Sequence, residues 1–141
     1  MFKDIKLLLS IAFCCLLSCT TNDDKSLAIR FSADRSKIIF SNIEPVGLYE
    51  LKTNIADSAY QALVTVLQTP RENDSTGMEI EWPGKLTIAG DQLVFTPKSP
   101  FVKGKNYLVE TMINLKFATS KDIVKGQIGH YVKPKQILLK R

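Results

Sequence analysis

The cysteines are the residues whose chemistry and spacing stand out first in this chain of 141 residues. All three, Cys14, Cys15 and Cys19, lie in the stretch LLLSIAFCCLLSCTTNDD at positions 7–24, and none follows. A deprotonated thiol is a strong nucleophile that can be alkylated. Because positions 20–141 hold no cysteine, a segment beginning at Cys19 can form neither an intramolecular disulfide nor a cysteine-based metal site.

The segment before Cys19 has the order of a secretory signal. Lys3 and Lys6 give a charged start, residues 7–17 are apolar except for Ser10, and the small Ser18 ends the segment. The apolar run is too short to span a bilayer as a helix, which needs roughly 20 residues. We therefore expect residues 1–18 to be a cleaved signal peptide.

The four residues at positions 16–19, Leu-Leu-Ser-Cys, resemble the lipobox of bacterial lipoproteins. The resemblance implies cleavage between Ser18 and Cys19 and a diacylglyceryl thioether on the sulfur of Cys19. Cys14 and Cys15 would leave with the signal peptide. A palmitate-type anchor on Cys19 would then hold the mature chain on a membrane.

Residues 19–26 are short and polar, and we expect them to be a lipidated tether. Asp23 and Asp24 resemble the acidic export signal of lipoproteins of the Bacteroidetes type. Thr20 differs from the Asp that resembles an inner-membrane retention signal at this place. The implied location is the outer membrane of the cell envelope, with either the periplasmic or the surface side open.

The mature domain, residues 27–141, has the pattern of many short strands. Alternation over 27–33 and 78–82 and β-branched runs such as 62–68 predict strands. Further predicted strands cover 38–40, 48–52, 85–89, 93–95, 106–113 and 137–139, and short closing strands are predicted at 123–124 and 127–132. Pro83-Gly84 and Gly90-Asp91 predict turns, and 56–61 predicts one helical turn capped by Asp57 or Asn54. We expect an all-β fold, an antiparallel sandwich or barrel.

The stretch LTIAGDQLVFTPKSPFVKGKNYLVET, residues 86–111, resembles the late half of bacterial Ig-like domains. The carrying motifs are Phe95-Thr96-Pro97, Pro100-Phe101 and the run Gly-x-x-Tyr-x-Val at 104–109. The resemblance implies an Ig-like antiparallel β-sandwich, with the strands after residue 114 left open. Independently of it, Tyr107 can bury its ring and hydrogen-bond through its hydroxyl near the preceding loop.

The charges are distributed unevenly along the chain. Residues 19–97 hold 7 basic and 11 acidic residues, net −4, whereas residues 98–141 hold 10 basic and 2 acidic, net +8. The basic part either meets an anionic surface or consists of solvated strand edges and turns, where lysines discourage aggregation. Its lysines are Lys98, Lys103, Lys105, Lys116, Lys121, Lys125, Lys133, Lys135 and Lys140. In the envelope, nucleic acid is not the expected partner.

The sequence contains no convincing set of catalytic residues. His130 is the one histidine, no Gly-x-Ser-x-Gly elbow accompanies it, and a zinc site would need more ligands. Glu79 and Glu81 share a strand face, but a working acid/base pair needs a pocket that separates their pKa values. We expect no enzymatic activity, no metal and no cofactor.

Two triplets, Asp57-Ser58-Ala59 and Asp74-Ser75-Thr76, resemble the site that some Bacteroidetes O-glycosylate. Ser75 is the better candidate because residues 71–76 form a polar loop, and Ser58 is the second. Trp82 and Tyr49 could stack on sugars, although a single Trp in a β domain is more often part of the core.

The sequence thus predicts a non-enzymatic, lipid-anchored envelope protein that binds a protein or glycan partner. One alternative is an assembly accessory that docks on an envelope complex or anionic lipid through its basic C-terminal region. A small hydrolase using His130 or the Glu79/Glu81 pair is the third.

Overall fold

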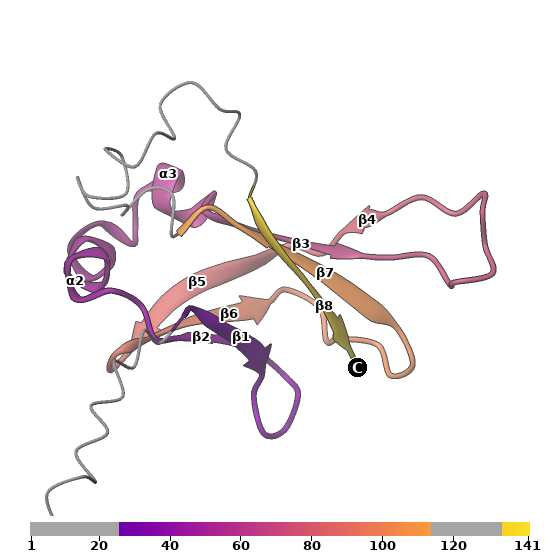
Figure 1. Cartoon of the computed structure of the whole chain (residues 1–141), viewed down its shortest axis with the longest axis horizontal. Coiled ribbons are helices and arrows are strands. Elements are labelled where there is room, and N and C mark those ends of the chain that lie inside the picture. Colours follow the sequence, from indigo (N-terminus) through magenta and orange to yellow (C-terminus); the bar gives the residue numbers. More distant parts are fainter. Residues whose placement is uncertain (1–25, 114–133) are drawn as a thin grey trace, which may run out of the picture.

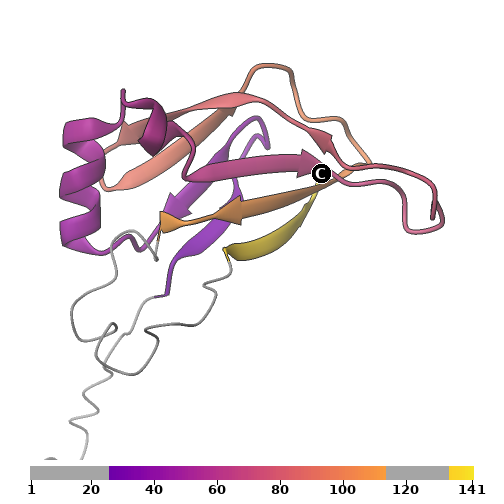
Figure 2. The same cartoon turned by 90° about the horizontal axis from the view of Figure 1, so that it is seen from above.

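A computed structural model describes residues 26–113 and 134–141 of the chain. These residues form two four-stranded antiparallel sheets packed face to face, with two short helices at one end (Figures 1 and 2). The elements in chain order are β1 (Ala28–Phe31), β2 (Ile38–Ser41), α2 (Pro45–Asn54), α3 (Ser58–Gln61), β3 (Val64–Gln68), β4 (Ile80–Glu81), β5 (Gly84–Ala89), β6 (Gln92–Pro97), β7 (Asn106–Thr111) and β8 (Lys135–Lys140). The predicted all-β sandwich is confirmed.

The strand order is β1-β2-β6-β5 in the first sheet and β4-β3-β7-β8 in the second. Each strand alternates between the space inside the sandwich and the outside, as the period of two in the sequence predicts. The inward side chains of the first sheet include Ile38, Phe40, Leu86, Leu93 and Phe95, and those of the second include Val64, Val66, Tyr107, Val109 and Ile137.

The segment 48–52, predicted as a strand, is part of helix α2, so that prediction is wrong. Pro45 occupies the first turn, where its fixed φ suits a helix and its missing N–H costs no hydrogen bond. Gly47 and Leu51, four residues apart, share the buried side, whereas Val46 and Tyr49 are exposed. The helical turn predicted at 56–61 is confirmed: Asp57 is the N-cap of α3 and accepts a hydrogen bond from the Ala59 N–H.

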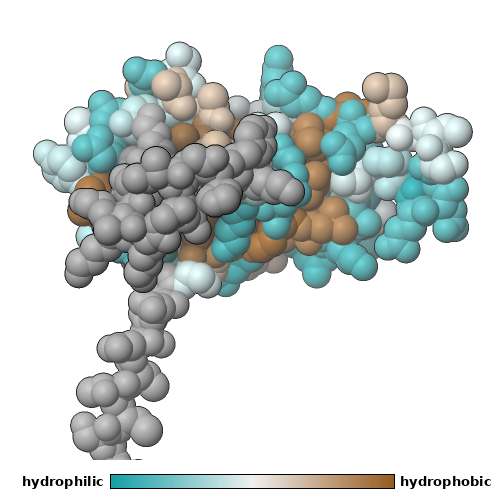
Figure 3. Space-filling view, turned by 45° about the horizontal axis from the view of Figure 1, so that its top comes forward, coloured by the Kyte–Doolittle hydropathy of each residue, from teal (hydrophilic) through white to brown (hydrophobic). Residues whose placement is uncertain are grey.

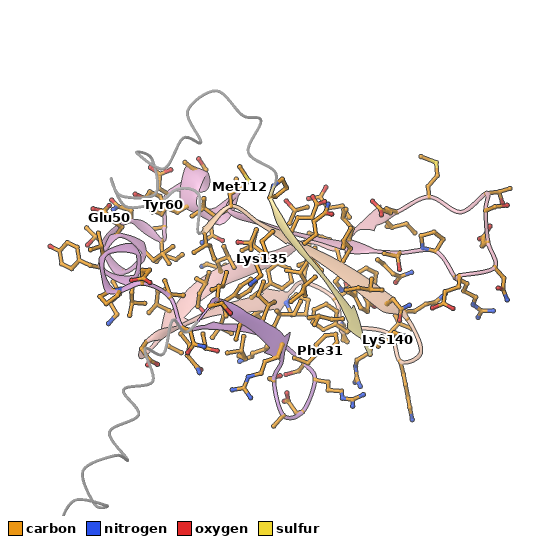
Figure 4. The ribbon with its side chains drawn as sticks, viewed as in Figure 1. Phe31, Glu50, Tyr60, Met112, Lys135 and Lys140 are labelled. Atoms are coloured by element: carbon orange, nitrogen blue, oxygen red, sulfur yellow. The ribbon has the colours of Figure 1, made fainter. Side chains whose placement is uncertain are left out.

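The two ends of the sandwich are closed differently. At the helix end, α2 and α3 cover the core, and Leu51 is fully buried there (Figure 1). At the loop end, the β6–β7 connection lies beside the C-terminus, and the β1–β2 and β3–β4 loops project from the sheets in different directions (Figure 1). Because β8 runs between the two ends, Lys135 lies at the helix end and Lys140 at the loop end (Figure 4).

The connection from β4 to β5 takes the chain from one sheet to the other. The Trp82 N–H donates to Val66 in β3, while the carbonyl of Pro83 accepts from the Lys98 N–H just after β6. Pro83-Gly84 is therefore a sheet-to-sheet crossing, and the turn predicted there is wrong. Pro83 has no N–H to extend the β3–β4 ladder, and at Gly84 a Cβ atom would stand 2.4 Å from the Phe95 ring.

The hairpin predicted at Gly90-Asp91 is confirmed. Ala89 pairs with Gln92, so only these two residues form the turn between β5 and β6. Gly90 has a φ of 63°, which fits the first central position of a type II′ turn.

Tyr107 organises the core at the loop end. Its side chain is fully buried, and its ring lies edge-to-face against Phe101 at 4.7 Å and against Trp82 at 5.5 Å between ring centroids. Its hydroxyl accepts a hydrogen bond of 2.7 Å from the Val102 N–H in the preceding loop. The predicted buried ring and hydroxyl contact are therefore confirmed.

Replacing Tyr107 by Phe should lower the free energy of unfolding by about 1–2 kcal/mol, because the Val102 N–H loses its acceptor. Chemical denaturation followed by tryptophan fluorescence measures this change. Tyr49→Phe is the matched control, since Tyr49 is 69% exposed on α2 and should change stability by less than about 0.5 kcal/mol. Equal effects of the two substitutions would contradict the assigned role of the hydroxyl.

The exposed edge of β5 is covered by a side-chain amide. Gln61 Oε1 accepts from the Leu86 N–H at 2.9 Å, and Gln61 Nε2 donates to the Leu86 carbonyl at 3.0 Å. The amide thus pairs with Leu86 as a further strand would. An edge strand whose backbone groups are satisfied in this way is a poorer template for aggregation.

Replacing Gln61 by Ala should therefore destabilise the protein by about 1–3 kcal/mol, since two backbone groups of Leu86 lose their partner. Thermal unfolding gives the stability, and light scattering near the midpoint reports association through the opened edge. Gln92→Ala, which truncates the same side-chain type on β6, is the control and should leave both quantities nearly unchanged. Unaltered stability of the Gln61 variant would show that its amide does not support β5.

Candidate functional site

The structure shows that charge is divided between the two outer faces of the sandwich. The outward positions of β1, β2, β5 and β6 on the first sheet include Arg30 and Lys85, and Lys37 directly precedes β2. None of the outward positions on these four strands is acidic; they are Ala28, Arg30, Ile39, Ser41, Lys85, Thr87, Ala89, Gln92, Val94 and Thr96. We call this surface the basic face.

The strand register brings the cations of the basic face together. Arg30 pairs with Ile39, Ile39 with Val94, and Val94 with Thr87, so these four side chains form one row across the sheet. In the next row Thr96 pairs with Lys85, and Lys37 lies on the other side of Thr96. Neighbouring strands are about 4.8 Å apart, which places the Cα atoms of Lys37 and Lys85 roughly 10 Å from each other.

A shallow groove lies on the same face. It has a volume of about 530 Å³ and is lined by Pro83, Gly84, Lys85, Thr87, Thr96, Pro97 and Lys98. Its polar side chains are two hydroxyls and two ammonium groups, and no carboxylate lines it. A groove with this lining is suited to an anionic group that packs against apolar surface and accepts hydrogen bonds at its rim.

Two acids lie in turns between strands of the basic face: Asp34 in the β1–β2 loop and Asp91 in the β5–β6 turn. Asp34 is engaged by its neighbours. The Ser32 hydroxyl, followed by the backbone and hydroxyl of Ser36, donates to its carboxylate and lowers its pKa to about 2. The carboxylate is therefore ionised near neutral pH, but it is already engaged by its own turn.

The outer face of the second sheet is different. Leu67 pairs with Leu108 and Leu108 with Leu138, so three leucines form a row that continues to Glu81 on β4. We call this surface the leucine face, and Leu138 is 49% exposed on it. Its charged side chains include Glu81, Glu110 and Lys140. Figure 3 shows brown apolar surface between teal polar surface on the side of the molecule that carries β7 and β8.

Of the residues considered for the hydrolase alternative, the structure describes Glu79 and Glu81. Glu81 lies on β4 and Glu79 just before it, and both are exposed. His130 lies outside the described residues, as do Ser18 and Cys19. Within residues 26–113 and 134–141, no group of three or more His, Cys, Asp or Glu could hold a metal ion.

Tyr60 has a perturbed pKa at the helix end. Its hydroxyl donates to the Glu50 carboxylate at 3.3 Å, and the two side chains lie together between α3 and α2 (Figure 4). Partial burial, with the Glu50 charge second, raises the pKa of the phenol. This makes Tyr60 a neutral hydrogen-bond donor that ties the two helices together, not a nucleophile.

The two candidate glycosylation serines have similar surroundings. The Asp57 carboxylate accepts a hydrogen bond from the Ala59 N–H, and the Asp74 carboxylate accepts one of 3.1 Å from the Thr76 N–H. Each hydrogen bond therefore spans the serine between its two partners. The Thr76 hydroxyl and N–H lower the pKa of Asp74. Ser58 and Ser75 are both exposed, but Ser58 begins α3 whereas Ser75 lies in the β3–β4 loop.

Of the two aromatic residues considered for sugar stacking, Trp82 belongs to the core. Its indole N–H donates to the Ser99 carbonyl at 3.0 Å and its ring packs on Tyr107. Tyr49 projects from α2 into solvent.

Comparison with protein-family models, with curated proteins and with solved structures finds no match for this chain. Among the described residues, the helices are too short and too polar to cross a bilayer.

Proposed function

We propose that this chain is a lipid-anchored protein of the bacterial outer membrane whose Ig-like domain binds a protein or glycan partner without catalysing a reaction. The observation that carries the proposal is the placing of a lipobox-like Leu-Leu-Ser-Cys at 16–19 ahead of a sandwich with a basic outer face. In this proposal the sulfur of Cys19 carries the lipid anchor, and the basic face is the surface that binds the partner.

Strand order supports the Ig-like assignment. The sheets β1-β2-β6-β5 and β4-β3-β7-β8 correspond, in chain order, to the A-B-E-D and C′-C-F-G sheets of Ig-type sandwiches. Tyr107 stands at the start of the strand in the F position and bonds to the loop before it, as the tyrosine corner of such domains does. The chain departs from antibody domains in having helices between β2 and β3 and no disulfide between the sheets.

The position of Leu27 gives the anchored domain an orientation. Leu27 lies at the helix end, where its carbonyl accepts a hydrogen bond from Lys135. The eight residues from Cys19 to Leu27 can span at most about 29 Å. With lipid on Cys19, a tether of this length would keep Leu27, and with it the helix end, within about 29 Å of the bilayer.

This orientation favours a partner over the protein's own bilayer. Among the described basic residues of the 98–141 region, Lys98, Lys103, Lys105, Lys140 and Arg141 lie at the loop end. The lysines at 116, 121, 125 and 133 lie outside the described residues. The assembly-accessory alternative therefore fits docking on an envelope complex better than docking on the lipid that anchors the chain.

Replacing Cys19 by Ala in the full-length protein should abolish lipidation, because the nucleophilic sulfur is gone. Mass spectrometry of the protein isolated from its native membrane should show no acyl mass on the variant. Cys14→Ser and Cys15→Ser are the matched controls and should keep the acyl mass on Cys19. A chain that carries no acyl mass on Cys19 without any substitution would refute the anchor.

Ser75 in its loop is the better candidate for O-glycosylation, and Ser75→Ala should remove glycan mass from protein isolated from its native membrane. Intact-mass measurement before and after chemical deglycosylation reports the change. Ser58→Ala, in a triplet of the same type at a helix start, is the control that should keep this mass. An identical glycan mass on the Ser75 variant and the unsubstituted protein would rule out that position.

A further inference from the structure

From the geometry of the basic face we propose that its ligand is an acidic polypeptide segment, laid across β1, β2, β6 and β5. The inference rests on the proposed function, since it names the partner class for the binding role. It adds the face that binds and the charge that the partner carries.

The first argument is charge. Arg30 lies at one end of the row formed by Ile39, Val94 and Thr87. Lys37 and Lys85 lie in the next row, and Lys98 joins them at the groove. All four cations are exposed, and no carboxylate occurs among the outward positions of the four strands. Like charges gathered on one face repel each other, and an anionic partner relieves this repulsion while it gains complementary contacts.

The second argument is the composition of the outward positions. Val94 points outward but is only 7% exposed, so it offers little apolar surface, and Ile39 next to it is half-buried. The outward positions of these four strands contain no aromatic ring, so the stacking surface that sugars commonly use is missing there. The face therefore fits a polypeptide better than a glycan.

The third argument is access. The partner cannot add as a strand to the edge of β5 at Leu86, because Gln61 already occupies the N–H and carbonyl there. Four strands are roughly 15–20 Å across, a width that about six extended residues span. A short acidic segment lying over the strands, with a carboxylate at the groove between Lys85 and Lys98, satisfies these limits.

The test measures binding of a fluorescein-labelled glutamate peptide of about ten residues to the full chain in neutral detergent, by fluorescence anisotropy. The triple variant Arg30→Gln, Lys37→Gln, Lys85→Gln should bind about tenfold more weakly, since each exposed ion pair contributes a fraction of a kcal/mol. The control Lys52→Gln, Lys103→Gln, Lys140→Gln removes the same charge from exposed positions elsewhere and should bind nearly as the unsubstituted protein does.

A second variant guards against loss of folding in the first. Thr87→Glu puts a carboxylate in the middle of the basic face at an exposed strand position and should also weaken the peptide several-fold. Unchanged thermal unfolding shows that each variant is folded. Amide shifts of Thr87, Val94 and Thr96 on addition of peptide should map the contact to this face.

Three results would overturn the proposal. Equal loss in the two triple variants would mean that only net charge matters. If an oligogalacturonate of the same length binds as tightly as the glutamate peptide, the ligand class is an acidic glycan and not a polypeptide. Amide shifts confined to residues of the leucine face would show that the peptide binds there and not on the basic face. None of these depends on lipid at Cys19, so failure here and failure of the anchor are distinguished.

Discussion

The loop end of this sandwich depends on the hydrogen bond between the Tyr107 hydroxyl and the Val102 N–H. The bond fixes the β6–β7 loop over the core and holds the Phe101 ring against the Tyr107 ring. The Phe31 ring packs on Phe101, with 5.2 Å between the two ring centroids. Because no cysteine follows Cys19, no disulfide joins the two sheets, and buried contacts such as these hold the layers together. The ring joins the second sheet to β1 of the first through Phe31, so one side chain serves both layers.

The opposite end is built with helices because the connection between β2 and β3 must cover the core and protect an edge at once. α2 buries Leu51, and α3 places Gln61 against β5. The bond from Tyr60 to Glu50 fixes one helix relative to the other. The helix end is therefore closed by side chains that also satisfy backbone groups of an edge strand.

Much of the fold could be predicted from local patterns. Alternation located most strands, Gly90-Asp91 located a hairpin, and Asp57 located a helix cap. Segment 48–52 was mispredicted because Leu48 and Leu51 suit either a strand or a helix, and only packing of Gly47 and Leu51 on the core decides between them. Pro83-Gly84 was mispredicted because a crossing between sheets has the same composition as a turn.

The basic face could not be found from the sequence, because it requires the register of four strands. The sequence placed the positive charge in residues 98–141, yet Arg30, Lys37 and Lys85 come from the segment with net negative charge. The outward direction of each residue was predictable. Each one directly precedes or follows an inward apolar residue, and side chains alternate between the two faces of a strand. Which outward residues become neighbours depends on pairings such as Ile39 with Val94.

The hydrogen bond from Lys135 to Leu27 joins residues 108 positions apart, and β1 lies next to β8 at this side of the sandwich. Such a closure cannot form until nearly the whole domain has been gathered, and sandwiches of this kind fold on the order of milliseconds to seconds. The contact between β1 and β8 is thus among the most non-local in the described part of the chain.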